Sequence, residues 1–304
     1  MNKFIYISLT VLMAGSLMAC DDLFDDDQYD FGGIVLGTES QGTLLAGDST
    51  LMEVPALQAG DLYIKHNIVL DGDTVMNYCL AYDTVKYHSR WVAFRFDESN
   101  RKKTTGRNNS FMDDPELPSR HFIGSSSFYS DGYNYDRGHL CASNDRLIST
   151  AANIQTFYMT NMSPQLPNFN QEYWVNYETF VQDLGRDDTF SDTLYVVKGG
   201  TIADNQIKEY VNRSNGKKVA VPEYYYMALV KCKNNAYEGI AFWMEHRYYD
   251  TEAENSKTKA EKLKHAVTID ELEKLTGIDF FANLPDAIET VVESSTNPAN
   301  WNLQ

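Results

Sequence analysis

Alternation of apolar and polar positions predicts several β-strands in this chain. The clearest case is 90–96, where basic and apolar residues alternate inside a longer strand-like stretch from 78 to 96. Side chains on a strand point to its two faces in turn, so this pattern is typical of a strand. Shorter segments rich in β-branched, aromatic and other apolar residues predict further strands at 156–160, 194–198, 224–230 and 236–244, and ordered structure is expected to begin near 62–64.

Helical spacing is found after the middle of the chain. Trp174, Tyr177 and Val181 recur on one face and predict a helix over about 171–184. The ten residues before it, 161–170, contain two prolines and predict a turn. By contrast, 100–130 is polar and interrupted by Gly and Pro, which predicts a long functional loop.

A second helix is predicted near the C-terminus from its end signals. Thr268 is followed three residues later by Glu271, which is the pattern of an N-terminal cap. Gly277 is a residue that commonly ends a helix. Together with the strands, the two helices predict a mixed α and β fold.

The first twenty residues differ from the rest of the chain. Lys3 precedes an apolar stretch at 4–18, and Leu17-Met18-Ala19-Cys20 resembles the lipobox of bacterial lipoproteins. A membrane-spanning helix needs about 20 apolar residues, which is more than this stretch offers. We therefore expect 1–19 to be a lipoprotein signal peptide and Cys20 to carry the lipid. An ordinary secretory signal or a short membrane anchor is the alternative.

An acidic run at 21–27 follows Cys20 directly. It resembles the export signal of surface lipoproteins in some Gram-negative bacteria, and the alternative is a solvated, self-repelling tether. We expect 20–58 to be an acidic tether and irregular lead-in, and 59–304 to be the folded domain. The expected location is the bacterial outer membrane, with the domain exposed at the cell surface.

The remaining cysteines leave the disulfide state open. Besides Cys20 the chain has Cys79, Cys141 and Cys232. Three thiols in an exported protein allow at most one intramolecular disulfide. The sequence does not decide which pair forms, or whether any pair does.

The charge balance is unusual for a protein that binds nucleic acid. The net charge is −17, whereas binding to phosphates is driven by basic groups. One region, 86–120, has eight basic residues against five acidic ones. We expect it to provide a local basic surface. The basic residues are Lys86, Arg90, Arg95, Arg101, Lys102, Lys103, Arg107 and Arg120.

Candidate chemistry is concentrated between 135 and 178. The sequence Asp136-Arg137-Gly138-His139 places a histidine beside a glycine. Asn170, Trp174 and Glu178 follow at intervals of four residues, so they share one side of the predicted helix. A neutral histidine can take a proton from water, and amide and carboxylate oxygens suit a hard divalent ion such as Mg²⁺. The set therefore suffices for phosphodiester cleavage.

These motifs resemble those of the DNA/RNA non-specific endonucleases. The resemblance is carried by Asp136-Arg137-Gly138-His139, then Asn161-x-x-Pro164-Gln165, then Asn170, Trp174 and Glu178, and it extends over about 60–292. It implies an α+β fold with a mixed or antiparallel central sheet flanked by helices, and a ββα-metal (His-Me) finger as the active site. The folded domain at 59–304 would be the endonuclease domain.

The resemblance also implies a role for each residue. His139 would be the general base, Asn170 the direct ligand of Mg²⁺ (for which Mn²⁺ can substitute), and Glu178 would orient metal-bound water. Arg107 would stabilise phosphate charge, Asn161 would hold the polar network, and Arg137 would contact substrate. Asp136, Gly138 and Trp174 would support the site. Substrates would be DNA and RNA, and the membrane would be reached through the lipid on Cys20.

One position departs from the pattern of some relatives. They carry an arginine four residues after the helix glutamate, where this chain has Gln182, so Arg186 is the candidate replacement. Two other functions stay open, a catalytically silent nucleic-acid-binding module and a phosphodiesterase for small phosphodiesters. The preference between DNA and RNA and the oligomeric state are also open.

Overall fold

A computed structural model describes residues 35–36 and 50–304, which lie in the unit that spans residues 33–304. The expected signal peptide, Cys20 and most of the expected tether lie outside the described residues. Within the described ranges, no helix combines the length and the apolar composition that crossing a bilayer requires.

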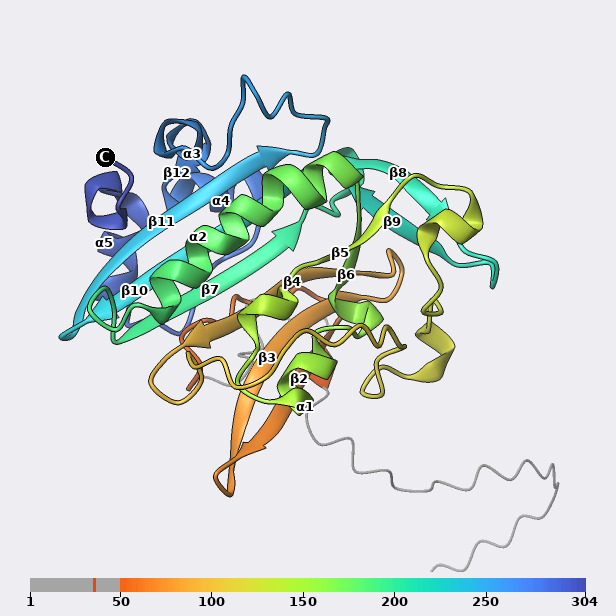
Figure 1. Cartoon of the computed structure of the whole chain (residues 1–304), viewed down its shortest axis with the longest axis horizontal. Helices are drawn as coiled ribbons and strands as arrows, with labels where there is room; N and C mark the ends of the chain where they lie inside the picture. The colour runs from red at the N-terminus through yellow and green to blue at the C-terminus, as the bar shows by residue number, and fades with distance from the viewer. Residues whose placement is uncertain (1–34, 37–49) are drawn as a thin grey trace, which may run out of the picture. The chain divides into compact units, whose positions relative to one another are not determined.

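An eight-stranded sheet forms the centre of the described fold (Figure 1). Each neighbouring pair of strands is antiparallel, so the expected mixed or antiparallel sheet is confirmed in its antiparallel form. In spatial order the strands are β1 (Val35–Leu36), β2 (Asp61–Leu70), β3 (Asp73–Asp83), β4 (His88–Phe96), β7 (Thr193–Gly200), β10 (Tyr224–Lys233), β11 (Ala236–Glu245) and β12 (Ala266–Val267).

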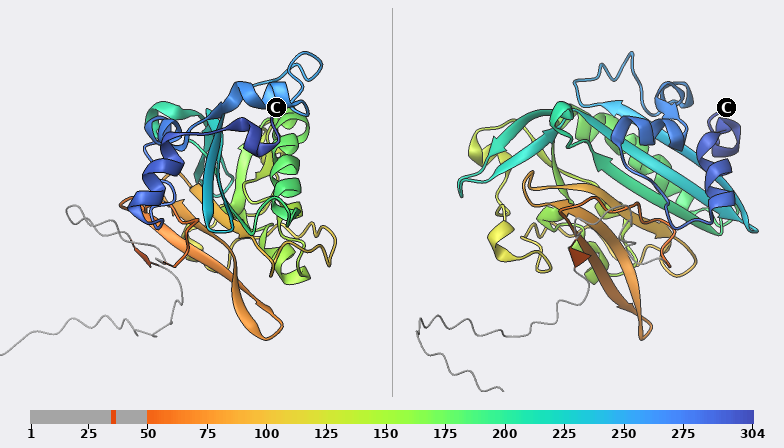
Figure 2. Two further views of the ribbon diagram at one scale, coloured as in Figure 1. Left: turned by 90° about the vertical axis from the view of Figure 1, so that its left-hand side faces the viewer. Right: turned by 180° about the vertical axis from the view of Figure 1, so that it is seen from behind.

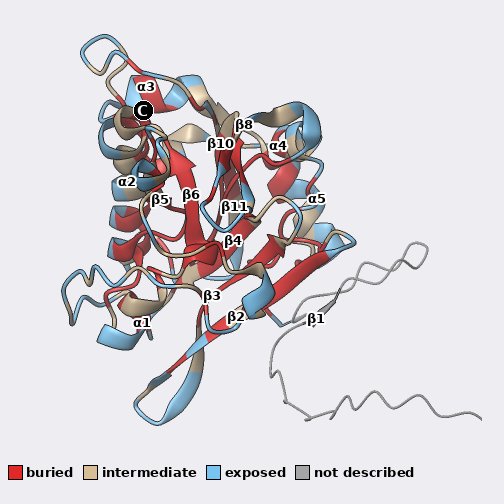
Figure 3. Cartoon of the chain, turned by 90° about the vertical axis from the view of Figure 1, so that its right-hand side faces the viewer, coloured by how far each residue is buried: buried red, intermediate tan, exposed pale blue. Residues whose placement is uncertain are grey.

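Helices cover both faces of this sheet, as the side view in Figure 2 shows. Helix α2 (Val175–Arg186) packs on one face, and α4 (Ile269–Thr276) and α5 (Asp286–Ser294) pack on the other. The alternation along β4 follows from this arrangement. Val92 belongs to the core under α2 and Trp91 to the core under α4. Buried residues therefore run along the central strands in Figure 3.

A glycine in β11 allows the close packing of α5 on the sheet. A Cβ atom at Gly239 would lie 2.6 Å from the carbonyl oxygen of Val292 and 2.7 Å from Cδ1 of Ile269. Any other residue would push α4 and α5 away from the strand, because backbone atoms cannot yield at that distance. Gly239 thus sets the position of the C-terminal helices.

Most predicted elements are confirmed. The strands predicted at 194–198, 224–230 and 236–244 lie within β7, β10 and β11, and residues 62–64, near which ordered structure was expected to begin, lie in β2. The strand-like stretch from 78 to 96 is divided by a turn between β3 and β4. The predicted C-terminal helix is α4, which Thr268 and Glu271 cap reciprocally and which ends at Gly277 with a φ of 69°. The region 100–130 is largely irregular.

The strand predicted at 156–160 is wrong. Helix α1 (Thr150–Gln155) begins at the N-cap Ser149 and occupies the segment before it, and Thr156 donates its hydroxyl hydrogen to the carbonyl of Asn153 to end that helix. The strand forms instead at β6 (Met162–Gln165), where a turn was predicted. The segment pairs only through a single parallel bridge between Tyr158 and Met112, which is too short to form a strand.

Several short elements have no strong sequence pattern. They include the hairpin β8 (Ile207–Asn212) and β9 (Lys218–Pro222), helix α3 (Lys259–His265) and strand β5 (Asp136–His139). The 3₁₀ turns are η1 (Ser119–His121), η2 (Phe128–Asp131), η3 (Ser143–Asp145), η4 (Met159–Asn161), η6 (Asp204–Gln206) and η7 (Pro298–Trp301).

The three cysteines of the described part form no disulfide with one another. Cys79, Cys141 and Cys232 are all buried. The question that the sequence left open is answered for these residues, since no disulfide links them. Burial raises the pKa of the Cys141 thiol well above its usual range, so this thiol stays protonated.

The buried His88 makes stability depend on pH. Its Nδ1 atom donates to the carbonyl of Ser89 at 2.7 Å, and Nε2 lies 2.6 Å from Oγ of Ser163. Burial lowers the pKa of His88 to about 4. Between that value and the pKa of about 6.5 in the unfolded chain, only the unfolded state takes up the proton. The stabilisation is therefore complete above pH 6.5 and is lost as the pH falls towards 4.

We predict that the free energy of unfolding of His88→Gln approaches that of wild type as the pH falls from 7 to 4.5. The difference should shrink by at most about 1.4 kcal/mol per pH unit, because one proton is linked to unfolding. Urea unfolding of both proteins at several pH values measures it. Asn134→Gln, at an exposed position that does not titrate, is the control. A difference that stays constant over this range would contradict the prediction.

Candidate active site

Two short strands and a helix form a ββα arrangement beside the main sheet. Strand β5 pairs antiparallel with β6, and His139 ends β5 opposite Met162. Gly138 is required just before it, because a Cβ atom there would lie 1.9 Å from Oε1 of the buried Gln165. After β6 the chain enters a π-helical turn, η5 (Phe169–Trp174), which continues into α2. Such turns are frequent at functional sites.

Asn161 holds the chain together immediately behind His139. It is fully buried, and its amide nitrogen donates to the carbonyl oxygens of Cys141 and Thr156 at 2.8 and 2.7 Å. Its Oδ1 accepts from the backbone nitrogen of Cys141 at 2.8 Å. Asn161 does not line the pocket described next. Its contacts fix the backbone on which His139 is presented.

A pocket of about 390 Å³ lies between the end of β5 and the start of α2. It brings together five of the residues singled out from the sequence: Arg107, Arg137, His139, Asn170 and Glu178. Its other lining residues are Ala142, Ser143, Asn144, Gln171, Val175, Thr179 and Gln182. Trp174 lies behind the pocket, fully buried, and its Nε1 donates to Oε1 of Glu178 at 3.0 Å.

His139 is buried and has a free ring nitrogen. It is 8% exposed, and its Nε2 atom has no hydrogen-bond partner among the described residues. Burial, reinforced by the charges of Arg107 and Arg137, lowers the pKa of His139 to about 3. The imidazole is therefore neutral at pH 7 and able to accept a proton.

An aromatic pair that the sequence did not indicate supports His139 and both arginines. The ring of Phe157 meets the His139 ring edge-on, with 4.9 Å between centroids, and Phe111 meets Phe157 edge-on at 5.0 Å. The guanidinium of Arg107 lies 5.0 Å from the Phe157 centroid, and that of Arg137 lies 3.6 Å from the Phe111 centroid. These cation–π contacts orient both positive charges at the pocket.

Asp136 orients the amide of Asn170. Oδ2 of Asp136 accepts from Nδ2 of Asn170 at 2.9 Å and from Nε2 of Gln171 at 2.6 Å, while the hydroxyl of Tyr129 donates to Oδ1. Because the amide nitrogen of Asn170 is engaged, its Oδ1 atom is left without a hydrogen bond from the described residues. An oxygen in that state suits a hard cation.

Glu178 is half-buried, and its surroundings disfavour the charged form of its carboxyl group. Burial raises the pKa of Glu178 to about 8, against the lowering effect of Lys198. A cation in the pocket would favour the ionised carboxylate, so the donor set of Asn170 and Glu178 fits a divalent metal. The positive charge of Arg107, which also lines the pocket, lowers the pKa of Glu178 as well.

A buried ion pair lies beneath this pocket and was not anticipated. Lys198 lies near the C-terminal end of β7, and its Nζ atom is 2.7 Å from Oδ2 of Asp145. Both side chains are completely buried. Gln182 donates to Oδ1 of Asp145 at 2.9 Å and accepts from Asn144 at 2.7 Å. The sequence offered one indication of this pair, because Lys198 is a charged residue in the otherwise apolar segment 194–198 and would need a buried partner.

Arg186 does not line the pocket. Its guanidinium donates to the carbonyl of Asn144 and lies 5.4 Å from the Phe96 ring. It lines a separate hollow with Arg101 and Lys102. The expectation that Arg186 takes the place of an arginine at position 182 is therefore not supported, and Gln182 serves the buried Asp145 instead.

The basic surface expected from 86–120 is also smaller than the charge count suggested. Four of the eight basic side chains are held by other groups: Lys86 by Asp204, Arg90 by Asp61, Arg95 by Asp97, and Arg101 by the carbonyl oxygens of Ser191 and Asp192. Among the described residues, Lys102, Lys103 and Arg120 form no ion pair, and Arg107 faces the pocket.

Comparison with known proteins places this arrangement in a family. The sequence model of the DNA/RNA non-specific endonucleases matches residues 58–287. The chain belongs to the DNA/RNA non-specific endonuclease family. It is thus an enzyme of the nuclease class, and its substrates are nucleic acids.

Individual relatives agree with this family assignment. The chain is 32% identical over 230 residues to a nuclease of Nostoc sp., covering 72% of this chain and 76% of the relative. It is 32% identical over 218 residues to nuclease C1 of Cunninghamella echinulata, covering 68% and 81%. A chain in the crystal structure of the EndoG/EndoGI complex has the same fold, with a TM-score of 0.55, 20% identity, and coverage of 74% and 89%.

Proposed function

We propose that His139 is the general base of a metal-dependent endonuclease that hydrolyses DNA and RNA without sequence preference. The observation that supports this most is the neutral, unpartnered Nε2 of His139 in one pocket with Asn170 and Glu178. In this reading Nε2 accepts the proton of the attacking water. The low pKa of His139 keeps it in the required neutral form.

The other pocket residues bind and orient the reacting groups. Arg107 and Arg137 are placed to donate hydrogen bonds to phosphate oxygens from opposite ends of the aromatic pair. Asn170 Oδ1 would hold Mg²⁺, or Mn²⁺ in its place, and the Glu178 carboxylate would orient the water around that ion. When bound, the ion would supply stabilisation of the charge that develops on phosphate. Such contacts read the backbone and not the bases, which is why no sequence preference is expected.

The test is cleavage of supercoiled plasmid and of a structured RNA at low salt. With Mg²⁺ added, wild type should cleave both polymers, and EDTA should stop cleavage reversibly. Asn170→Ala should lose activity by about 100-fold or more, as for loss of a metal partner. Asn134→Ala, an exposed asparagine before β5, is the matched control.

Other results would point to other functions. Cleavage of a small phosphodiester without cleavage of either polymer would replace the endonuclease by a small-substrate phosphodiesterase. Binding of DNA without any cleavage, by protein shown to be folded, would indicate a silent binding module. Cleavage that persists in EDTA would remove the metal from the proposal.

We predict that Asp136→Ala weakens catalysis through the orientation of Asn170. The Asn170 amide would lose its acceptor and become free to rotate, so activity should fall by about 10- to 100-fold and half-maximal cleavage should need more Mg²⁺. Asp136→Asn keeps one acceptor oxygen and should retain more activity. If both variants lost the same activity and needed no more Mg²⁺ than wild type, Asp136 would support the fold and would not orient Asn170.

For the N-terminal region, we propose an exported lipoprotein of the bacterial outer membrane, exposed at the cell surface. Residues 1–19 would be removed, Cys20 would carry the lipid, and 20–58 would connect it to the domain at 59–304. The lipobox-like sequence and the acidic run support this. Expression in a Gram-negative host tests it, since Cys20→Ala should move the protein from the membrane fraction to the soluble fraction. Membrane association that does not depend on Cys20 would contradict it.

A further inference from the structure

A group of carboxylates comes together from α4 and α5. These two helices lie on the face of the sheet opposite α2 (Figure 2). Asp270 and Glu273 stand one turn apart on α4, and Glu293 is near the end of α5. One carboxylate oxygen from each lies within 4.8 Å of the others. Three negative charges this close are unfavourable unless something neutralises them.

Glu293 is the unusual member of this group. It is only 6% exposed, and its Oε1 atom is buried without a hydrogen-bond partner among the described residues. An unpaired carboxylate oxygen at this depth carries a large desolvation cost. Glu273 is better placed, because Oε1 accepts the backbone hydrogen of Phe280 at 2.8 Å.

No positive side chain compensates the group. Within the described part of the chain, Asp270, Glu273 and Glu293 take part in no ion pair. The surrounding charges that act most on Glu293 are also negative, and they include Glu289 and Asp279. Burial and these like charges raise the pKa of Glu293 to about 9 and that of Glu273 to about 7.

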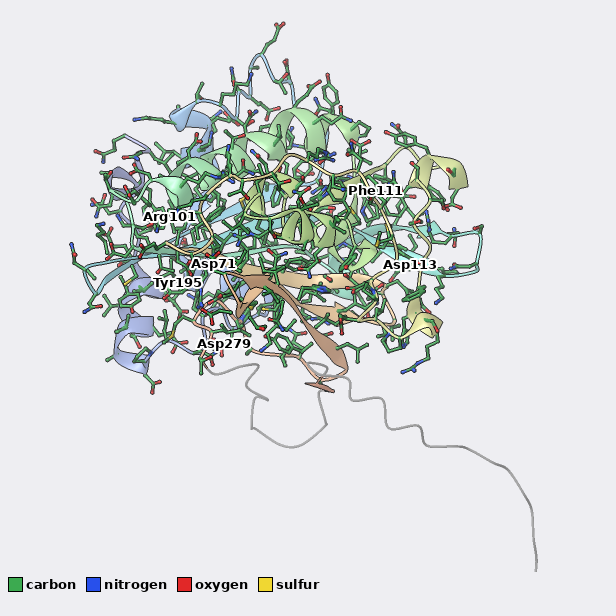
Figure 4. All side chains as sticks on the ribbon, turned by 60° about the horizontal axis from the view of Figure 1, so that its bottom comes forward. Asp71, Arg101, Phe111, Asp113, Tyr195 and Asp279 are labelled. Carbon is green, nitrogen blue, oxygen red and sulfur yellow. The ribbon has the colours of Figure 1, made fainter. Side chains whose placement is uncertain are left out.

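The group is separate from the candidate active site. Asp279 lies beside it, and Phe111 lies against His139 at a ring distance of 6.0 Å. The two labelled residues are well apart in Figure 4. A ligand at the carboxylates would therefore not be the metal of the catalytic pocket.

We propose that Asp270, Glu273 and Glu293 form a second divalent-cation site, suited to Ca²⁺, that joins α4 to α5. Ca²⁺ accepts several carboxylates at about 2.3–2.6 Å, so oxygens on opposite sides of the ion are about 4.6–5.2 Å apart, which is compatible with this spacing. Mg²⁺ usually binds only one or two carboxylates and keeps most of its water. The partner that Glu293 lacks is thus a calcium ion, and its role is to stabilise the C-terminal helices.

Thermal unfolding of the purified full chain, stripped with EDTA and then titrated with CaCl₂, tests this. The Asn170→Ala background removes the contribution of the catalytic pocket. At about 100 times the dissociation constant, Ca²⁺ should raise Tm by roughly 5 °C or more. Glu293→Gln should abolish this rise, and in EDTA its Tm should equal or exceed that of the parent, because glutamine cannot acquire a negative charge at this buried position.

Two further variants complete the experiment. Asp270→Asn, at a half-buried position, should weaken calcium affinity by at least tenfold, and Glu252→Gln, an exposed glutamate in another loop, should behave as the parent does. Glu293→Gln in the otherwise wild-type chain should cleave DNA as wild type does. A Tm that does not respond to Ca²⁺, or a response that Glu293→Gln keeps in full, would overturn the proposal, whatever the cleavage assay shows.

Discussion

His139→Ala is expected to reduce the cleavage rate of plasmid DNA by about 10²- to 10⁴-fold, the range that a positioned general base contributes. The variant loses the one ring nitrogen in the pocket that is neutral and unpartnered. Arg107 and Arg137 remain, so binding of the substrate should change much less than the rate. Single-turnover cleavage at saturating protein separates the two quantities.

The matched control is His121→Ala, in the surface loop, which should cleave as wild type does. The fold of His139→Ala should be intact, because the aromatic contacts of Phe111 and Phe157 with each other do not need the imidazole. A rate within tenfold of wild type would show that another group accepts the proton. A folded variant with lost DNA binding would instead indicate that His139 positions the substrate.

Lys198→Met is expected to lower the free energy of unfolding by about 3–5 kcal/mol, since it leaves the carboxylate of Asp145 buried without its counter-ion. The carboxylate would keep hydrogen bonds from Gln182 and from the backbone of Ala142, at 2.9 and 2.8 Å, but no positive charge. Urea unfolding at pH 7 measures the change. The same variant should lose activity, because Lys198 favours the charged form of Glu178.

Lys233→Met is the matched control for this experiment. Lys233 pairs with Asp192 at the surface, where water screens both charges, so the loss of stability should be far smaller than for Lys198→Met. The double variant Lys198→Met with Asp145→Leu should recover part of the lost stability, because no unpaired charge remains. A single-variant loss below about 1 kcal/mol would mean that the pair is not held as a buried salt bridge.

Sequence patterns predicted the elements whose signals are local. Alternation at 90–96 and apolar segments elsewhere located the long strands, and the capping residues of α4 located both its ends, because these features depend on neighbours a few residues apart. Spacing alone also indicated that Asn170 and Glu178 share a side of one helix, and the structure places both in the pocket with His139. The π-helical turn at Asn170 was not predictable from that spacing.

Errors occurred where the deciding partner is distant in the chain. Strand β6 forms because β5 pairs with it. The segment at 156–160 is not a strand because its pairing is limited to one bridge, between Tyr158 and Met112. The basic region 86–120 lost much of its free charge to partners such as Asp204 and Asp61, which no local pattern connects to it. A count of charges along the sequence does not show which of them are neutralised by residues distant in the chain.

The sequence by itself determined the family motif, the order of the main strands and helices, and the set of residues around His139. Only the tertiary structure decided that Phe111 and Phe157 support the pocket, that Lys198 and Asp145 pair beneath it, and that Glu293 is buried among like charges. The physical reason is that desolvation and ion pairing depend on what surrounds a group in space. Those neighbours come from segments that only the folded chain brings together.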